Sequence, residues 1–142
     1  MSEQMDESEI RQYIEMASDD LAAAKDNVQL GHLRVAVSRA YYAMFYAATA
    51  VLGSRGLWRS KHQGIIAAFG EHLVKPGLVD ARYGRMLHGS FETRVDSDYA
   101  PLLALDEAAV VSQITDAEEF VQQMIKLLST PPAIQGKDYG TA

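Results

Sequence analysis

Three groups of charged and aromatic side chains could do chemistry in this chain of 142 residues. The first is Arg39 with the rings of segment 41–46. The second is the Arg-Ser-Lys-His segment 59–62, and the third is segment 94–99. Arginine beside aromatic rings can stack on nucleobases and bind phosphate. A helix start that carries lysine and histidine can bind an anion. All three groups therefore point to an anionic ligand.

The aromatic group lies in a strongly helical segment. Tyr41, Tyr42, Phe45 and Tyr46 follow Arg39 within about two helical turns. Most of these rings are interpreted as core or interface residues whose hydroxyls are satisfied locally. The role of Arg39 stays open, with ligand binding as the functional hypothesis.

The second group marks the expected start of a short helix. Ser60 is the predicted N-cap of this helix. Two interpretations carry equal weight here. Either Lys61 and His62 bind a negative charge at the start of the helix, or Ser60 caps the helix and its basic neighbours are solvated.

The third group ends an apolar stripe. Tyr83, Leu87, Phe91 and Arg94 share one face of a predicted helix. A guanidinium at the end of such a stripe is costly unless it is paired. Asp98 is one turn beyond Arg94, so a salt bridge within the helix is one interpretation. Neutralisation of a ligand phosphate is the other.

Several other kinds of site are excluded by their missing signatures. The chain has no cysteine, and it has no Glu-x-x-His pair of the kind that holds metals in helical bundles. It also lacks a nucleophile elbow and the glycine-rich phosphate loops. We therefore predict no metal site and no cofactor.

Helical periodicity places these groups on about five helices, and no segment alternates at period two. The segment around 33–52 has two apolar stripes, whereas the first and last helices have one each. A helix that is apolar on two faces is central or shared with a partner. The prediction is an all-α, up-and-down antiparallel bundle that forms a homodimer through the extra face. The expected helices cover about 6–30, 33–52, 60–73, 80–94 or slightly beyond, and 107–128 with Asp106 as the N-cap.

Charge and composition limit the partners. The net charge is −6, but residues 31–99 carry nine basic and five acidic side chains. This local excess is compatible with RNA or a nucleotide. Segment 1–9 lacks a signal pattern, and the apolar run 40–52 is too short to span a membrane. We expect a cytoplasmic protein with no membrane partner, one domain over 1–129 and a disordered tail over 130–142.

The three groups together resemble the HEPN superfamily, and more narrowly its branch of small uncharacterised bacterial and archaeal proteins. Their order and spacing match over residues 8–129. The resemblance implies a helical bundle that forms a homodimer. It also implies a toxin–antitoxin setting, because many relatives are encoded beside a minimal nucleotidyltransferase. Active members are metal-independent endoribonucleases that use an arginine followed, after four to six residues, by a histidine.

Carried onto this chain, the family's arginine is Arg94. The positions where its histidine would stand hold Tyr99, Ala100 and Pro101. The missing histidine favours a dimeric binding and assembly module whose Arg94 and Lys61 region engages RNA, a nucleotide or a nucleotidyltransferase partner. The alternative is a ribonuclease with an altered constellation, in which Arg94 acts with Tyr99, Asp98 or His62.

Overall fold

The amphipathic segments are helices in the computed structural model, which describes residues 4–99 and 105–129 apart from the side chain of Tyr99. No strand occurs among these residues, and the predicted all-α fold is confirmed. The elements are α1 (Glu7–Gln29), α2 (Leu33–Ser54), α3 (His62–Phe69), the π-helix η1 (Gly70–Val74), α4 (Ala81–Tyr99) and α5 (Glu107–Leu128).

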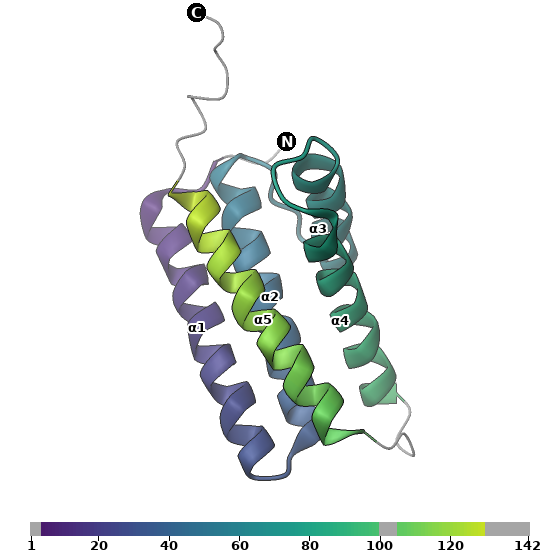
Figure 1. The fold of residues 1–142 in the computed structure, drawn as a ribbon. Coiled ribbons are helices and arrows are strands. Elements are labelled where there is room, and N and C mark those ends of the chain that lie inside the picture. Colours follow the sequence, from purple (N-terminus) through teal and green to yellow (C-terminus); the bar gives the residue numbers. More distant parts are fainter. Residues whose placement is uncertain (1–3, 100–104, 130–142) are drawn as a thin grey trace, which may run out of the picture.

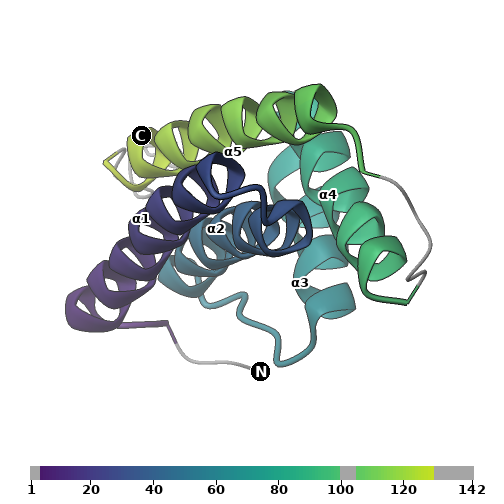
Figure 2. The same cartoon turned by 90° about the horizontal axis from the view of Figure 1, so that it is seen from below.

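The long helices α1, α2, α4 and α5 alternate in direction along the bundle (Figure 1). In the view along the axis, α2 lies in the middle, with α1 and α4 on its flanks and α5 across one side (Figure 2). The side of α2 away from α5 has no described helix across it. Ala100 and Pro101, two of the positions where the family's histidine would stand, and the expected tail 130–142 fall outside the described residues.

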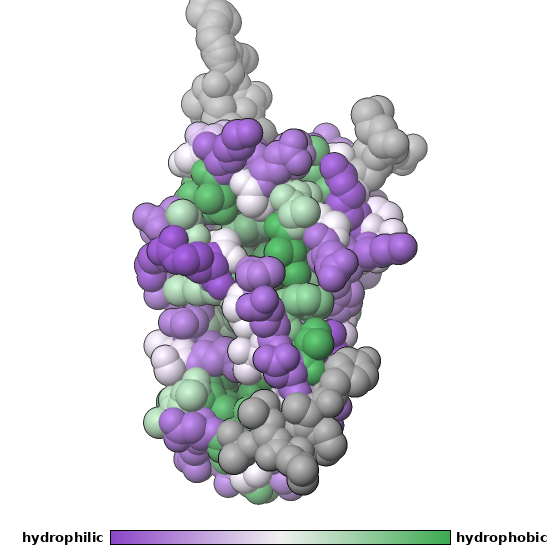
Figure 3. All heavy atoms as spheres, turned by 90° about the vertical axis from the view of Figure 1, so that its right-hand side faces the viewer, coloured by the Kyte–Doolittle hydropathy of each residue, from purple (hydrophilic) through white to green (hydrophobic). Residues whose placement is uncertain are grey.

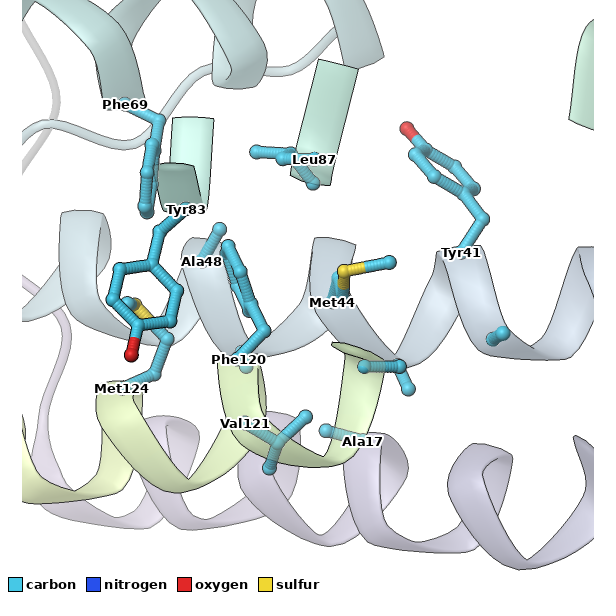
Figure 4. Packing of buried hydrophobic residues seen from close by; sticks show 14 of the residues in the cluster. Ala17, Tyr41, Met44, Ala48, Phe69, Tyr83, Leu87, Phe120, Val121 and Met124 are labelled. Carbon is cyan, nitrogen blue, oxygen red and sulfur yellow. The ribbon is translucent and has the colours of Figure 1, made fainter. Parts of the chain in front are cut away.

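The core forms where α2 meets the other helices. Met44 and Ala48 of α2 have no exposed surface, and rings from α3, α4 and α5 pack over them (Figure 4). The rings of Phe69 and Phe120 stack at 5.3 Å, and Tyr83 meets Phe120 at 6.1 Å. Each fully buried side chain of this size contributes about 1.5–3 kcal/mol.

Two helix starts agree with local sequence chemistry, and one differs. Asp6 and Glu9 form a reciprocal capping box at α1, and Asp106 caps α5 as predicted, accepting from the amide of Ala108. The prediction that Ser60 caps the third helix is wrong. The N-cap is Lys61, which is extended and makes no side-chain capping bond. The preceding turn is held instead by Arg59, whose guanidinium donates to backbone carbonyls there.

The two-faced character of α2 has two different structural causes. The C-terminal end of α2 is covered by the chain's own N-terminal segment. The side-chain amide of Gln4 donates to the carbonyl of Ser54, and the backbone N–H of Met5 donates to the carbonyl of Gly53. Tyr42, Phe45 and Tyr46, nearer the N-terminal end, remain half-exposed. The prediction of an unoccupied face therefore applies to the N-terminal half of α2.

The apolar character of α2 also meets a length and composition test for a membrane-spanning helix. The window that passes this test is 67% buried inside the bundle, as expected for a core helix. On the α3–α4 side of the molecule, hydrophobic residues appear as separate spots among hydrophilic ones (Figure 3). That side offers no single broad apolar patch.

Candidate functional site

Arg94 lies near the C-terminal end of α4 and faces the rings of α2. Its Cζ atom is 5.5 Å from the centroid of the Tyr41 ring, 5.7 Å from that of Tyr42 and 5.9 Å from that of Phe91. Only 19% of its side chain is exposed. Ring faces attract a guanidinium, and they do so more strongly where water is excluded. The apolar stripe of α4 therefore ends in a cation held against aromatic rings.

The guanidinium of Arg94 is only partly neutralised. Its Nη1 donates to Asp98 Oδ2 at 2.9 Å, which confirms the predicted pair within the helix. Arg34 of α2 approaches the other oxygen of Asp98 at 4.0 Å, so two arginines share one carboxylate. The buried Nε of Arg94 has no hydrogen-bond partner in the described part of the chain. A buried donor without an acceptor is costly.

His62, the first residue of α3, joins the same cluster. Its Nδ1 lies 2.8 Å from the hydroxyl of Tyr41, and its ring stacks on Phe45 with centroids 4.1 Å apart. Partial burial lowers the pKa of His62, and the positive charge of Arg94 lowers it further. The imidazole is therefore neutral at neutral pH.

Tyr41 connects these groups from the centre of the bundle. It has no exposed surface, and its side chain projects from α2 away from α5 (Figure 4). Burial raises the pKa of the Tyr41 hydroxyl, so it keeps its proton. The bond to His62 Nδ1 couples the hydroxyl to the neutral imidazole. If the hydroxyl donates, Nε2 carries the N–H, and if the hydroxyl accepts, Nε2 presents a lone pair.

These groups can bind a phosphate and move a proton. Arg94 supplies positive charge and an unsatisfied N–H, and His62 supplies a neutral imidazole in the same cluster. Asp98 is used as the partner of Arg94 and Arg34, which leaves it poorly suited as a proton acceptor. The side chain of Tyr99 lies outside the described residues.

The other predicted ligand-binding residues have separate surroundings. Lys61 is exposed and precedes His62 in the chain. Arg39 points toward α1, where it pairs with Asp20 at 2.9 Å, and its Cζ lies 5.1 Å from the Tyr42 ring. Because Tyr42 also contacts Arg94, its ring is shared by both arginines.

Sequence reasoning missed two members of these networks and one hydrogen bond. Asp20 is only 9% exposed although it is a carboxylate; its spacing from Ala17 and Ala24 on the buried face of α1 was the available signal. Arg34 reaches across to α4 and donates to the carbonyl of Ser97, and no local pattern indicates that contact. The bond between Tyr41 and His62 joins residues 21 positions apart, so it depends on tertiary structure.

A metal site and the cleft between α4 and α5 are the other possible functional sites. Within the described residues, no three His, Asp or Glu side chains gather in a way that could hold a metal ion. A cleft of about 330 Å³ lies between α4 and α5 over Met44 and is lined by Ser90 and Gln113. Ser90 and Gln113 hydrogen-bond to each other, and neither Arg94 nor His62 lines that cleft. The charged cluster is therefore the better candidate for chemistry.

Comparison with known proteins gives one family. Residues 10–129 match the family model described as HEPN domain. The chain is 39% identical over 120 residues to "Putative toxin MJ0605" of Methanocaldococcus jannaschii, which covers 84% of this chain and 89% of the relative. It is 38% identical over 112 residues to a "UPF0332 protein" of Thermotoga maritima, covering 79% and 85%. A more distant similarity, 23% over 133 residues covering 94% and 90%, is to "Putative toxin MJ0142" of M. jannaschii.

Proposed function

Because the chain belongs to the HEPN domain family, we propose that it is a toxin-like HEPN module that binds a phosphate of RNA or of a nucleotide at Arg94 and His62. Two relatives are named as toxins, which supports a toxin–antitoxin setting. A nucleotidyltransferase is the protein partner that fits such a setting. Binding is the primary role in this proposal.

The observation that carries the proposal is the state of Arg94. Its guanidinium is mostly buried against aromatic rings, yet one N–H has no acceptor within the described residues. Asp98 is shared with Arg34, so the three side chains keep a net positive charge. A phosphate at the exposed part of the Arg94 side chain would supply the missing negative charge.

A second candidate function is metal-independent ribonuclease, and the position of His62 favours it. The family's histidine is missing after Arg94, but α3 brings a neutral imidazole into the same cluster. A neutral imidazole can take the proton of an RNA 2′-hydroxyl as that oxygen attacks the adjacent phosphorus. The imidazolium then returns this proton to the 5′-oxygen of the next nucleotide, which leaves as a hydroxyl, and a 2′,3′-cyclic phosphate remains. Arg94 stabilises the charge on the phosphate during this step.

The experiment is incubation of wild type, Arg94→Ala and His62→Asn with labelled single-stranded and structured RNAs in EDTA, read by native shift and denaturing gel. Arg85→Ala, an exposed arginine on the same helix, is the matched control. Binding that is lost in Arg94→Ala and retained in Arg85→Ala supports the proposal. Cleavage that needs both Arg94 and His62 supports the ribonuclease instead.

Two other outcomes would contradict the proposal. Equal binding by Arg94→Ala and wild type would show that the site assignment is wrong. RNA that stays intact and unshifted with wild type, together with no binding of a labelled mononucleotide, would reject a phosphate ligand. A nucleotidyltransferase partner would then have to be sought by co-purification.

We further propose that the protein forms a homodimer through the half-exposed side of α2. Tyr42, Phe45 and Tyr46 occupy this side, and Val35, about two turns nearer the start of α2, is 46% exposed. Its cover within the same chain is partial: the His62 ring of α3 stacks on Phe45, and the Tyr13 ring of α1 lies 6.0 Å from that of Tyr46. Tyrosine and neighbouring arginine are the residue types enriched at the centres of protein interfaces.

A further inference from the structure

The loop between α2 and α3, residues 55–61, carries an exposed aromatic ring between cations. Trp58 is 37% exposed and is the only tryptophan of the chain. Arg59 and Lys61 follow it and are also exposed. No aspartate or glutamate occurs between Asp26 and Glu71, although the chain as a whole has a net charge of −6. The loop is therefore locally positive on an acidic protein.

Several contacts hold this loop in one conformation. The amide of Leu57 donates to the carbonyl of Leu52 at 2.8 Å, and the Leu57 side chain packs against the core. Nη1 of Arg59 donates to the carbonyls of Leu57 and Trp58, both at 3.1 Å. The stem of Arg59 also lies close to Gly64 in the first turn of α3. The Trp58 ring is thus presented from a braced turn.

The loop leads directly into the candidate phosphate site. It runs along the open side of α2 and ends at the start of α3 (Figure 2). His62, the next residue after the loop, is bonded to Tyr41 in the Arg94 cluster. A nucleic-acid strand with one phosphate at Arg94 could therefore place a neighbouring nucleotide on the loop.

We propose that the α2–α3 loop is a base-stacking subsite for single-stranded RNA. A nucleobase stacks on the Trp58 ring, and Lys61 and Arg59 contact the flanking phosphates. Stacking on an aromatic ring requires an unpaired base, whereas duplex bases are already stacked on each other. This inference rests on the proposed phosphate site at Arg94 and adds the class of ligand, a strand longer than one nucleotide.

Composition favours RNA over a protein partner at this loop. An exposed tryptophan could also be an interface anchor, but lysine and serine, both present in this loop, are depleted at protein interfaces. Trp58 is followed by Arg59, Ser60 and Lys61, and the loop contains no carboxylate. An aromatic ring among cations is the arrangement used by single-strand binding grooves.

Trp58 fluorescence gives a direct test, because no other tryptophan contributes to the signal. Wild type is titrated with a short single-stranded RNA, with an abasic strand of the same length and with a blunt RNA duplex. We expect the single strand to quench the emission strongly and the abasic strand and the duplex to quench it weakly. Equal quenching by the intact and abasic strands would contradict base stacking.

Affinity measurements on variants separate this inference from the function on which it rests. Trp58→Ala should weaken binding of the single strand by about tenfold, Trp58→Phe should recover most of the loss, and neither should affect the abasic strand. Leu30→Ala, which removes another exposed apolar side chain, is the control and should have no effect. Lys61→Ala should reduce the salt dependence of binding by about one ion.

Three outcomes would overturn the inference. If Arg94→Ala abolishes binding but Trp58→Ala does not weaken it, the phosphate site stands and the loop subsite is wrong. If wild type binds no RNA, both are wrong. If Trp58→Ala changes the oligomeric state measured by light scattering and leaves RNA affinity unchanged, the loop is an interface between copies of the chain.

Discussion

The hydroxyl of Tyr41 lies 2.8 Å from Nδ1 of His62, which joins the buried face of the central helix α2 to the first residue of α3. Tyr41 is fully buried, so its hydroxyl has little access to water. The bond satisfies a buried polar group and also orients the imidazole beside Arg94. A core contact and a property of the candidate site therefore depend on the same two atoms.

Tyr41→Phe should cost about 1 kcal/mol of unfolding free energy, because it leaves His62 Nδ1 without its partner. It should also change the ratio of the two imidazole tautomers, because the hydroxyl no longer hydrogen-bonds to Nδ1, which a merely destabilising substitution would not do. Nitrogen-15 NMR of His62 measures the tautomer, and urea denaturation measures the stability. Tyr42→Phe on the same helix is the control, and an unchanged His62 spectrum in Tyr41→Phe would contradict the prediction.

Stability should decrease as the pH falls below about 6.5, the ordinary pKa of histidine. The folded pKa of His62 lies below its unfolded value because of burial and Arg94, so the unfolded chain takes up a proton before the folded chain does. The contribution of His62 to the free energy of unfolding is constant above about pH 6.5. Below this pH it falls by at most about 1.4 kcal/mol per pH unit.

The measurement is the unfolding free energy of wild type and His62→Gln between about pH 5 and 8. The two curves should converge toward acid pH, because the variant lacks the titrating group. His88→Gln is the control, since its side chain is 59% exposed beside Glu92. Parallel curves for wild type and His62→Gln would show that His62 does not titrate abnormally.

Arg39→Ala should destabilise the protein by about 1–2 kcal/mol. Its partner Asp20, at 2.9 Å, is only 9% exposed. Burial raises the pKa of the Asp20 carboxyl and Arg39 opposes this rise, so removal of Arg39 leaves a buried carboxylate without its cation. The expected loss is below that for a fully buried pair, because 36% of the Arg39 side chain meets solvent. Adding Asp20→Asn to the variant should recover part of the loss.

Lys25→Ala provides the comparison for that pair. The Lys25–Glu118 salt bridge also involves α1, but its side chains are 54% and 43% exposed. Loss of this salt bridge should lower the free energy of unfolding, measured by thermal unfolding, by less than about 1 kcal/mol. Equal losses in Arg39→Ala and Lys25→Ala would mean that the burial of Asp20 has no energetic consequence.

Gly53→Ala should be less stabilising than Gly89→Ala. A β-carbon at Gly53 would collide with the thioether of Met5, whose backbone N–H donates to the Gly53 carbonyl at 2.9 Å. A β-carbon at Gly89 in α4 would meet no atom within 4 Å. Alanine at 89 should stabilise the helix by about 0.5–1 kcal/mol, whereas alanine at 53 should stabilise it less, because the flexible Met5 side chain has to move away.

Hydrogen exchange at the Met5 amide tests the mechanism, because Gly53→Ala should speed it while Gly89→Ala leaves it unchanged. Faster exchange in both variants would point to general loosening of the bundle.

Val35→Asp should dissociate the proposed homodimer. The side chain is 46% exposed on the same side of α2 as Tyr42, so a carboxylate there would have to be buried on association. Val111→Asp on α5, where the residue is 44% exposed, is the matched control. Light scattering should give a dimer for wild type and Val111→Asp and a monomer for Val35→Asp. A monomeric wild type would reject the dimer.

Hydrophobic periodicity and capping residues in the sequence were enough to predict the helices. The stripes of α1 and α5, the Asp106 cap and the central position of α2 follow from residues three to seven positions apart, because a helix makes such residues neighbours. The pair Arg94–Asp98 was predictable for the same reason. The family assignment also followed from the order of these local groups.

Only the tertiary structure decided how His62, Tyr41 and Arg94 meet. They stand on three different helices, and their approach depends on the lengths of the connections and on how α3 packs against α2 and α4. The pairing of Asp20 with Arg39 and the cover of Gly53 by Met5 have the same origin. Helical periodicity specifies which residues of one helix share a face, but it does not specify which face of another helix they will contact.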